Sequence, residues 1–206
     1  MKLQIAFDLT DLTQALEIAR QVEEHADILE VGTLLLYKNG VRAVEEFKQI
    51  FPRKVILADS KIVDRGKEAA TTLTSAGADW ITVMAGTGNE VIHAACTAAH
   101  QSNTKVMLDL VDATSVGQAA LDAKNMGVDA LMFHQAYDEK DALILLDKWE
   151  MVRGNTPLPI FVSAKITRGT IATIVAIKPD GIIIGKSIID SDSPAQEAAF
   201  YKSLCQ

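Results

Sequence analysis

A group of ionisable residues follows an apolar segment about a quarter of the way along the chain. Residues 55–58 are apolar, and Asp59, Lys61 and Asp64 follow directly after them. An apolar run that ends in charges is typical of a buried strand emerging into a polar site. Because side chains alternate along a strand, we expect Asp59 and Lys61 to project to the same side, with Asp64 in the loop before a helix. Two carboxylates and an ammonium can bind a metal, position a hydroxyl or transfer a proton, although a surface salt bridge would give the same local pattern.

Composition restricts the class of protein. The chain has 206 residues, of which 49% are hydrophobic and 23% charged, as expected for one globular domain. The net charge of −7 argues against general affinity for nucleic acid or for an anionic membrane, while a small anionic substrate stays possible. Cys96 and Cys205 fit neither a disulfide framework nor a zinc site. With no signal-peptide pattern and no apolar run of about 18 residues, we expect a cytoplasmic protein without a membrane span.

Strand-like and helix-like segments alternate along the whole sequence. The strands are expected at residues 3–7, 28–31, 55–58, 80–84, 105–110, 130–133, 160–162 and 182–184. The helices are expected after an N-cap at Asp11 or Thr13, and then at residues 41–50, 67–75, 90–99, 115–125, 139–149, 170–176 and 194–204. Alternation of this kind predicts an α/β protein with a parallel sheet and external helices. Eight such units predict a closed (β/α)8 TIM barrel, formed as a single domain by residues 1–206.

A weak internal repeat supports four pairs of units. Aspartates precede the even strands at Asp27, Asp79, Asp129 and Asp180, with spacings of 52, 50 and 51 residues. We interpret these as solitary charges in loops and turns. The rival architecture is a doubly wound open sheet, which predicts a glycine-rich turn after the first strand. Residues 8–11 lack that motif, so the barrel is favoured.

Ionisable side chains recur where the strands of such a barrel would end. They are Asp8, Glu30, Asp59 with Lys61, Asp109 and His134. Active sites of these barrels lie at the carboxyl ends of the strands, so all six side chains would meet at one mouth. Any one of them could be a structural ion-pair partner. Several carboxylates at one mouth are harder to explain as packing, because their repulsion is unfavourable unless a cation relieves it.

Two of these carboxylates suit a metal ion. Glu30 and Asp59 stand on neighbouring strands, which lie about 5 Å apart. Carboxylates together with water and substrate oxygens are the ligands that Mg²⁺ accepts. Zinc is less favoured, because His134 is the one histidine expected at this mouth.

The segment from Asp59 to Asp64 resembles the D-x-K-x-x-D motif of the orotidine 5′-phosphate decarboxylase superfamily. Residues 2–8, 29–33, 184–188 and 192–194 resemble its branch of hexulose-6-phosphate synthases and 3-keto-L-gulonate-6-phosphate decarboxylases. Decarboxylases of orotidine 5′-phosphate carry lysine where this chain has Glu30, which disfavours that activity.

The resemblance implies a dimeric, Mg²⁺-dependent lyase that acts through a 1,2-enediolate of a phosphorylated sugar. Glu30 and Asp59 would hold the metal, and Lys61 would share the negative charge that develops. By the same resemblance, Asp64 would reach the neighbouring subunit's site in a homodimer.

The resemblance also assigns roles to the other side chains of the mouth. Asp109 would bind a sugar hydroxyl, His134 would move a proton, and Asp8 would contact the sugar.

Within this branch the sequence favours the synthase, which condenses formaldehyde with D-ribulose 5-phosphate. The decarboxylases carry glutamate in place of Asp109 and arginine in place of Tyr137. Residues 33–36, 40–44 and 185–187 are closer to the decarboxylases, which therefore stay the alternative.

The expected phosphate site departs from the family pattern. The family has two glycines after the seventh strand, and here Ala164 and Lys165 replace them after Ser163. Their Cβ atoms hinder close backbone approach to a phosphate, whereas the lysine adds charge. Gly185, Lys186 and Ser187, which follow the eighth strand, remain available to bind the phosphate. Arg65 adds a positive charge at the rim of the mouth. A non-catalytic barrel that binds a phosphosugar is the alternative of another class.

Overall fold

Eight parallel strands form a closed ring in the computed structural model, which describes residues 1–139 and 143–205. Each strand pairs with the next along the chain, and β1 closes the ring by pairing with β8. The strands are β1 (Lys2–Phe7), β2 (Ile28–Val31), β3 (Val55–Ile62), β4 (Trp80–Met84), β5 (Lys105–Asp109), β6 (Ala130–His134), β7 (Ile160–Ser163) and β8 (Gly181–Ile184). The predicted (β/α)8 barrel is confirmed.

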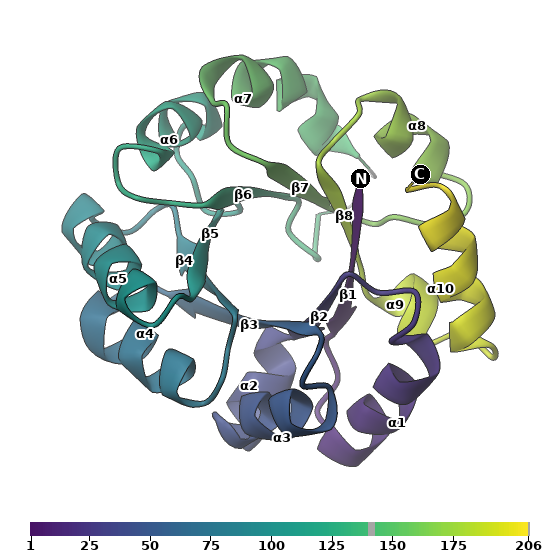
Figure 1. The fold of residues 1–206 in the computed structure, drawn as a ribbon. Coiled ribbons are helices and arrows are strands. Elements are labelled where there is room, and N and C mark those ends of the chain that lie inside the picture. Colours follow the sequence, from purple (N-terminus) through teal and green to yellow (C-terminus); the bar gives the residue numbers. More distant parts are fainter. Residues whose placement is uncertain (140–142, 206) are drawn as a thin grey trace.

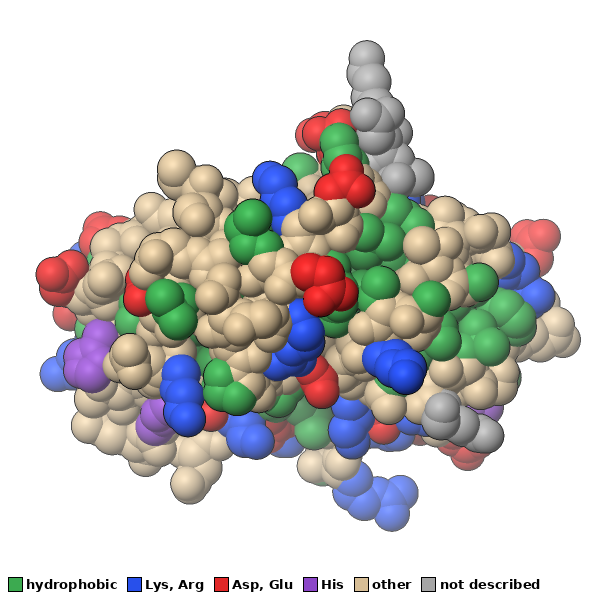
Figure 2. All heavy atoms as spheres, turned by 90° about the horizontal axis from the view of Figure 1, so that it is seen from above, with side chains coloured by type: hydrophobic (Ala, Val, Ile, Leu, Met, Phe, Trp, Pro, Cys, Tyr) green, Lys and Arg blue, Asp and Glu red, His purple; other side chains and the backbone are tan. Residues whose placement is uncertain are grey.

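Helices surround the ring on its outer side (Figure 1). They are α1 (Leu12–Val22), α2 (Thr33–Asn39), α3 (Arg42–Ile50), α4 (Gly66–Ser75), α5 (Asn89–Gln101), α6 (Val116–Ala123), the 3-10 helix η1 (Ile144–Lys148), α7 (Trp149–Asn155), α8 (Ile171–Ala176), α9 (Lys186–Ile189) and α10 (Pro194–Ser203). Among the described residues, no helix is long and apolar enough to cross a membrane. The face drawn in Figure 2 carries acidic and basic side chains close together rather than a field of one sign.

The helix predicted at residues 139–149 is wrong in both its position and its type. Residues 140–142 lie outside the described part of the chain, and a 3-10 helix leads into α7, which begins at Trp149. The Trp149 ring packs against Phe133, with ring centroids 6.0 Å apart. The apolar side chains that suggested one long helix are therefore divided between two shorter ones. Helices α2 and α9, at the ends of β2 and β8, were not predicted.

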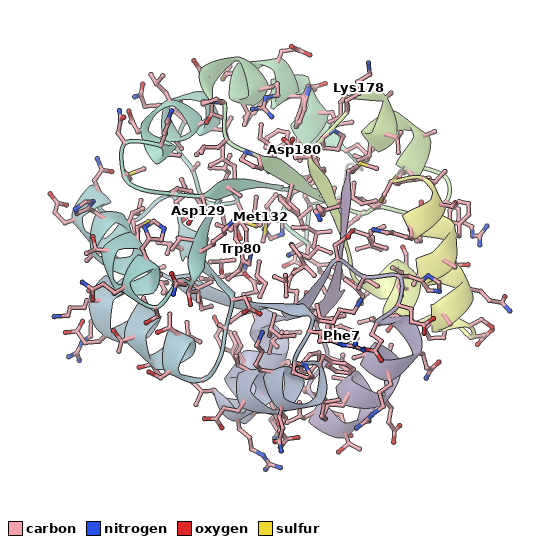
Figure 3. The ribbon with its side chains drawn as sticks, in the orientation of Figure 1. Phe7, Trp80, Asp129, Met132, Lys178 and Asp180 are labelled. Atoms are coloured by element: carbon pink, nitrogen blue, oxygen red, sulfur yellow. The ribbon has the colours of Figure 1, made fainter. Side chains whose placement is uncertain are left out.

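Side-chain alternation divides the apolar residues into two sets. Phe7 points outward to the helices, and its ring lies 5.3 Å from that of Phe47 on α3. Trp80 and Met132 point into the barrel, where they pack with other interior side chains (Figure 3). Gly181 also faces this interior, because a Cβ there would lie 2.3 Å from the ring of Phe161. The packed interior closes the barrel below the polar mouth.

The four repeated aspartates lie at the amino-terminal ends of the strands, which we call the base of the barrel. Each accepts the backbone N–H of the preceding odd strand at 2.8 Å, from Leu3, Ile56, Val106 and Ile160 respectively. Each also contacts one basic side chain of an outer helix, in the pairs Asp27–Lys202, Asp79–Lys48, Asp129–His100 and Asp180–Arg153. Our interpretation of these aspartates as solitary charges is therefore wrong. They link strands to helices, which explains their regular spacing.

Candidate functional site

Lys61 lies at the centre of the polar mouth. Its Nζ is 2.7 Å from Oδ2 of Asp109 and 3.1 Å from Oδ2 of Asp59. The prediction that Asp59 and Lys61 project to the same side is confirmed. The backbone of Lys61 is left-handed, with φ +46°, at an irregularity in the register of β3 with β4. Its N–H donates to Oγ1 of Thr82 at 2.9 Å, which holds this unusual conformation.

Asp59 is held by hydroxyl groups as well as by Lys61. Oγ1 of Thr33 donates to its Oδ2 at 2.6 Å, and Oγ1 of Thr82 donates to its Oδ1 at 2.8 Å. Neither threonine was identified from the sequence. The signal that could have found Thr82 is alternation along β4, since it lies two residues after the inward-pointing Trp80. These contacts leave Asp59 buried and narrowly oriented.

Asp109 joins Lys61 to His134. Nδ1 of His134 lies 2.9 and 3.0 Å from the two carboxylate oxygens of Asp109, and the N–H of Val111 donates to Oδ1. Burial opposes the charge of Asp109, but His134 and then Lys61 outweigh it and lower its pKa. Burial likewise opposes the charge of Lys61, and Asp59 and Asp109 outweigh it and raise its pKa. The cluster therefore holds an ammonium between two carboxylates.

Glu30 lies deeper, beside a glutamine. Its side chain is buried, and its Oε2 accepts a hydrogen bond of 2.6 Å from Nε2 of Gln4. Burial, then the charges of Asp59 and Asp8, raise the pKa of Glu30 well above its ordinary value. Asp8 is exposed at the rim, and desolvation there, followed by the charge of Asp59, raises its pKa. Gly32 leaves room for Asp8, since a Cβ would lie 2.3 Å from Oδ1 of Asp8.

These three carboxylates offer oxygen atoms, the kind of donor that a hard divalent cation prefers. The charge of Asp59 opposes ionisation of both Asp8 and Glu30, and the donor atoms of all three side chains are oxygens. The described residues contain no group of three or more His, Cys, Asp or Glu side chains arranged to hold a metal by themselves. A cation here would therefore depend on water or substrate oxygens to complete its coordination.

Asp64 is not part of this cluster within one chain. It is exposed, and its Oδ1 accepts the N–H of Arg65, whose backbone is left-handed with φ +52°. Among the described residues, Asp64 makes no hydrogen bond or ion pair with Lys61 or Asp109. Its expected function across a subunit interface stays a prediction.

The side of the mouth formed by β7 and β8 carries a second group of cations. Nζ of Lys186 donates to the hydroxyl of Tyr137 at 2.7 Å and lies 4.8 Å from the ring centroid. Nζ of Lys165 lies 5.8 Å from the same ring and donates to the carbonyl of Glu139. The tyrosine thus brings the two lysines together.

The remaining residues expected to bind phosphate stand at the ends of these strands. Ser163 ends β7, and Gly185 immediately precedes α9. The hydroxyl of Ser187 donates to the carbonyl of Ile166 at 2.6 Å. The Ser187 side chain therefore has a structural partner, and lysine side chains are the stronger candidates for an anion.

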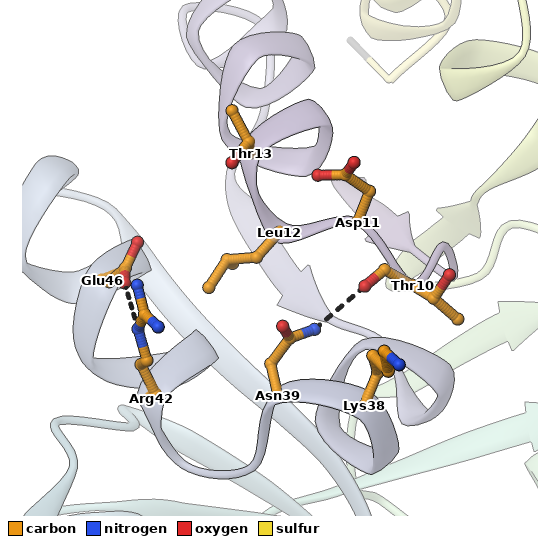
Figure 4. A pocket seen from close by; sticks show the side chains of 8 residues that line it. All are labelled: Thr10, Asp11, Leu12, Thr13, Lys38, Asn39, Arg42 and Glu46. Atoms are coloured by element: carbon orange, nitrogen blue, oxygen red, sulfur yellow. Dashed lines mark hydrogen bonds and ion pairs between the residues drawn. The ribbon is translucent and has the colours of Figure 1, made fainter.

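A separate polar cavity of about 420 Å³ lies between the β1–α1 connection and helices α2 and α3 (Figure 4). Two of the contacts across it join lining residues to one another. Asn39 donates to the carbonyl of Thr10 at 3.1 Å, and Arg42 pairs with Glu46 at 2.6 Å. It shares no residue with the Lys61 cluster.

Comparison with known proteins identifies the family. The model of the "Orotidine 5'-phosphate decarboxylase / HUMPS family" matches residues 1–201. The chain belongs to this family. This membership confirms the resemblance that the D-x-K-x-x-D motif indicated.

Within the Orotidine 5'-phosphate decarboxylase / HUMPS family, the chain is similar to 3-hexulose-6-phosphate synthases. The synthase of Bacillus subtilis (strain 168) is 30% identical over 206 residues, which cover 99% of this chain and 98% of the relative. The solved structure of the synthase from Salmonella typhimurium has a TM-score of 0.93 and 30% identity, and the match covers 100% of this chain and 98% of that one. The structure of KGPDC from Streptococcus mutans, solved as a complex, has a TM-score of 0.91 and 25% identity, with 99% and 96% covered. The expected branch of the family is confirmed.

Proposed function

We propose that the protein is a 3-hexulose-6-phosphate synthase-like aldolase, a lyase that condenses formaldehyde with D-ribulose 5-phosphate. Its synthase relatives support this activity over the decarboxylase. The observation that carries the mechanism is the position of Lys61, whose ammonium lies within 2.7 and 3.1 Å of carboxylates from two strands. A fixed cation in a half-buried mouth is suited to stabilise the negative charge of an enediolate.

In this proposal, His134 is the residue that transfers protons to and from the substrate. Asp109 holds Nδ1 of the imidazole, so Nε2 is the nitrogen that can exchange a proton with the substrate. Removal of a proton from C1 of ribulose 5-phosphate leaves the 1,2-enediolate, and C1 then forms a bond to the carbon of formaldehyde. The oxygen of the former aldehyde takes up a proton as the C–C bond forms. Asp109 orients the imidazole and accepts a hydrogen bond from a sugar hydroxyl.

A divalent cation, Mg²⁺, completes the proposed site. Glu30 and Asp59 would hold it, with Asp8 close by, and it would supply further positive charge to the oxygens of the enediolate. The observation in favour is that burial, and then the charges of Asp59 and Asp8, raise the pKa of Glu30, since a cation would relieve the repulsion between these carboxylates.

The phosphate would lie on the opposite side of the mouth. Lys165 and Lys186 would bind it through their side chains, with Ser163, Gly185 and Ser187 lining the approach. Because Ala164 and Lys165 stand where the family has glycines, binding of the phosphate would depend on ammonium groups more than on backbone N–H groups.

The proposed assembly is a homodimer in which Asp64 reaches the neighbouring site. Three exposed apolar side chains support such an interface. One of them precedes Asp64 in the sequence, and the other two lie on the adjoining helix α2. Leu34 is 50%, Tyr37 78% and Val63 60% exposed. Sedimentation measurements test the dimer. Mixing Asp64→Asn subunits with Lys61→Ala subunits tests the shared site, since one restored site per mixed dimer is expected if the two residues act across the interface.

The activity is tested by three assays of the purified protein with Mg²⁺. We expect consumption of formaldehyde with ribulose 5-phosphate, and little release of CO₂ from 3-keto-L-gulonate 6-phosphate. The reverse result would assign the decarboxylase. Incubation with ribulose 5-phosphate in D₂O separates both enzymes from a barrel that only binds sugar phosphates, since binding alone exchanges no proton at C1. Full turnover by Asp109→Ala would contradict the mechanism for either enzyme.

A further inference from the structure

Gln4 is a fully buried polar residue inside the barrel. Its side chain points into the interior from β1, and its register partners on both sides are Ile28 of β2 and Ile183 of β8. Both isoleucines belong to the apolar interior cluster. An apolar side chain would pack at this position without the free-energy cost of burying an amide.

The two ends of the amide have different surroundings. Nε2 donates to Oε2 of Glu30 at 2.6 Å, whereas Oε1 is buried with no hydrogen-bond partner among the described residues. A buried polar atom without a partner is unfavourable, because it loses its hydrogen bonds to water and gains none in the protein. Packing and stability alone therefore do not account for a glutamine here. The feature that sets it apart is its short bond to a buried carboxylate of the mouth.

The position of that bond determines how Glu30 is presented. Gln4 lies below Glu30 in the barrel, since Cα of Glu30 pairs with Ala6, two residues farther along β1. By engaging Oε2, the amide directs the carboxylate and restricts its rotation. Asp59 receives comparable support from the hydroxyls of Thr33 and Thr82. Outer contacts of this kind commonly tune the affinity of a metal ligand by about 10- to 100-fold.

We propose that Gln4 is a positioning residue, which orients Glu30 as a ligand for the divalent cation. The inference rests on the proposed metal site at Glu30 and Asp59. It predicts that replacing the amide weakens metal binding although Gln4 itself does not touch the metal.

The test is a titration of the purified protein with Mn²⁺, which stands in for Mg²⁺ and is followed by the loss of the free-ion signal in electron paramagnetic resonance. In Gln4→Met, a side chain of similar length packs without donating, and the Kd for Mn²⁺ is expected to rise about 10- to 100-fold. Gln4→Asn keeps the amide but is one methylene too short to reach Glu30, so it is expected to weaken binding as well. Circular dichroism verifies that each variant is folded.

Thr104→Val is the matched control. Oγ1 of Thr104 donates to the carbonyl of Ala78 at 2.9 Å, so this variant also loses a buried hydrogen bond, but at the base of the barrel. Its Kd for Mn²⁺ is expected to equal that of the wild-type protein. A Kd within twofold of wild type in both folded Gln4 variants, with binding lost in Glu30→Gln, would overturn the proposal for Gln4 and leave the metal site intact. Absence of Mn²⁺ binding by the wild-type protein would overturn the metal site and, with it, this inference.

Discussion

Carboxylates at the two ends of the barrel have different surroundings. At the base, each of four aspartates accepts a backbone N–H and contacts its own basic side chain from an outer helix, as Asp79 does with Ile56 and Lys48. At the mouth, Asp59 and Asp109 share the single ammonium of Lys61, and Glu30 has the neutral amide of Gln4. Each of the four aspartates of the base has its own basic partner, whereas around Lys61, on the side of the mouth away from Lys165 and Lys186, the carboxylates outnumber the ammonium groups.

This difference separates a structural use of carboxylates at the base from the functional use that we propose at the mouth. At the base, the Lys202 ammonium and the Leu3 N–H overcome the effect of burial and lower the pKa of Asp27, which stabilises the fold. At the mouth, burial and neighbouring carboxylates raise the pKa of Glu30, which is unfavourable in the protein alone. An arrangement that costs stability in the free protein is expected where a ligand later offsets the cost.

The largest expected effect comes from removing the central cation of the mouth. Lys61→Met should lower turnover by about 10²–10³-fold, because the charge proposed to face the enediolate is lost. Lys48→Met removes a lysine from the base and is the matched control, with turnover within twofold of wild type. Steady-state kinetics of both variants check the comparison. Equal losses in the two variants would mean that the mouth and the base do not differ in function.

A smaller effect is expected on the β7–β8 side of the mouth. Lys186→Ala should raise the KM for ribulose 5-phosphate about tenfold with kcat little changed, since an ammonium proposed to bind the phosphate is lost. The dependence of KM on salt should also weaken. The solvent-exposed Lys124 provides a control, because Lys124→Ala should leave KM unchanged. An unaltered KM in Lys186→Ala would remove this lysine from the phosphate site.

At the base, the expected effect is on stability. Asp79→Ala removes the side-chain acceptor of the Ile56 N–H and the carboxylate partner of the Lys48 ammonium, and should lower the free energy of unfolding by about 1–2 kcal/mol. Because the side chains of Lys48 and Asp79 are both partly exposed, the expected loss of stability is at the low end of the range for hydrogen bonds to charged groups. Urea unfolding measures the change. A variant as stable as wild type but impaired in turnover would contradict the structural role given to the base.

The smallest expected effect is a dependence of stability on pH, which tests the electrostatic difference between the mouth and the base. A carboxyl group whose pKa is raised in the folded state stabilises the fold at acidic pH, and that contribution is lost as pH rises through the folded pKa. Glu30 should therefore destabilise the metal-free protein at pH 8 relative to pH 5.5. Mg²⁺ should raise Tm more at pH 8 than at pH 5.5, whereas Glu30→Gln should lose this difference. Thermal unfolding with and without Mg²⁺ at the two pH values measures the Tm of the metal-free protein and its increase with Mg²⁺. An equal response of the wild-type protein and Glu30→Gln to pH and Mg²⁺ would contradict the role given to Glu30.

Local patterns in the sequence were sufficient to predict the eight-stranded barrel and the mouth at which its polar side chains meet. Short apolar runs that alternate with helix-like segments define the strands, and parallel strands place Asp59, Asp109 and His134 at the same end. Alternation also predicted that Lys61 lies on the same side as Asp59, whereas the left-handed backbone of Lys61, held by Thr82, was not predicted. These features depend on residues close together in the chain and on one topological rule, so no knowledge of distant contacts was needed.

The pairing of side chains, in contrast, could be known only from the folded molecule. Asp27 contacts Lys202 from the far end of the chain, Tyr137 meets Lys186, and Gln4 reaches Glu30. The helix expected at residues 139–149 failed for the same reason, since Trp149 packs on Phe133 from the start of α7. Such contacts depend on the direction and reach of side chains from separate elements. Neighbouring residues specify each element, whereas the closure of the barrel selects which of their side chains meet.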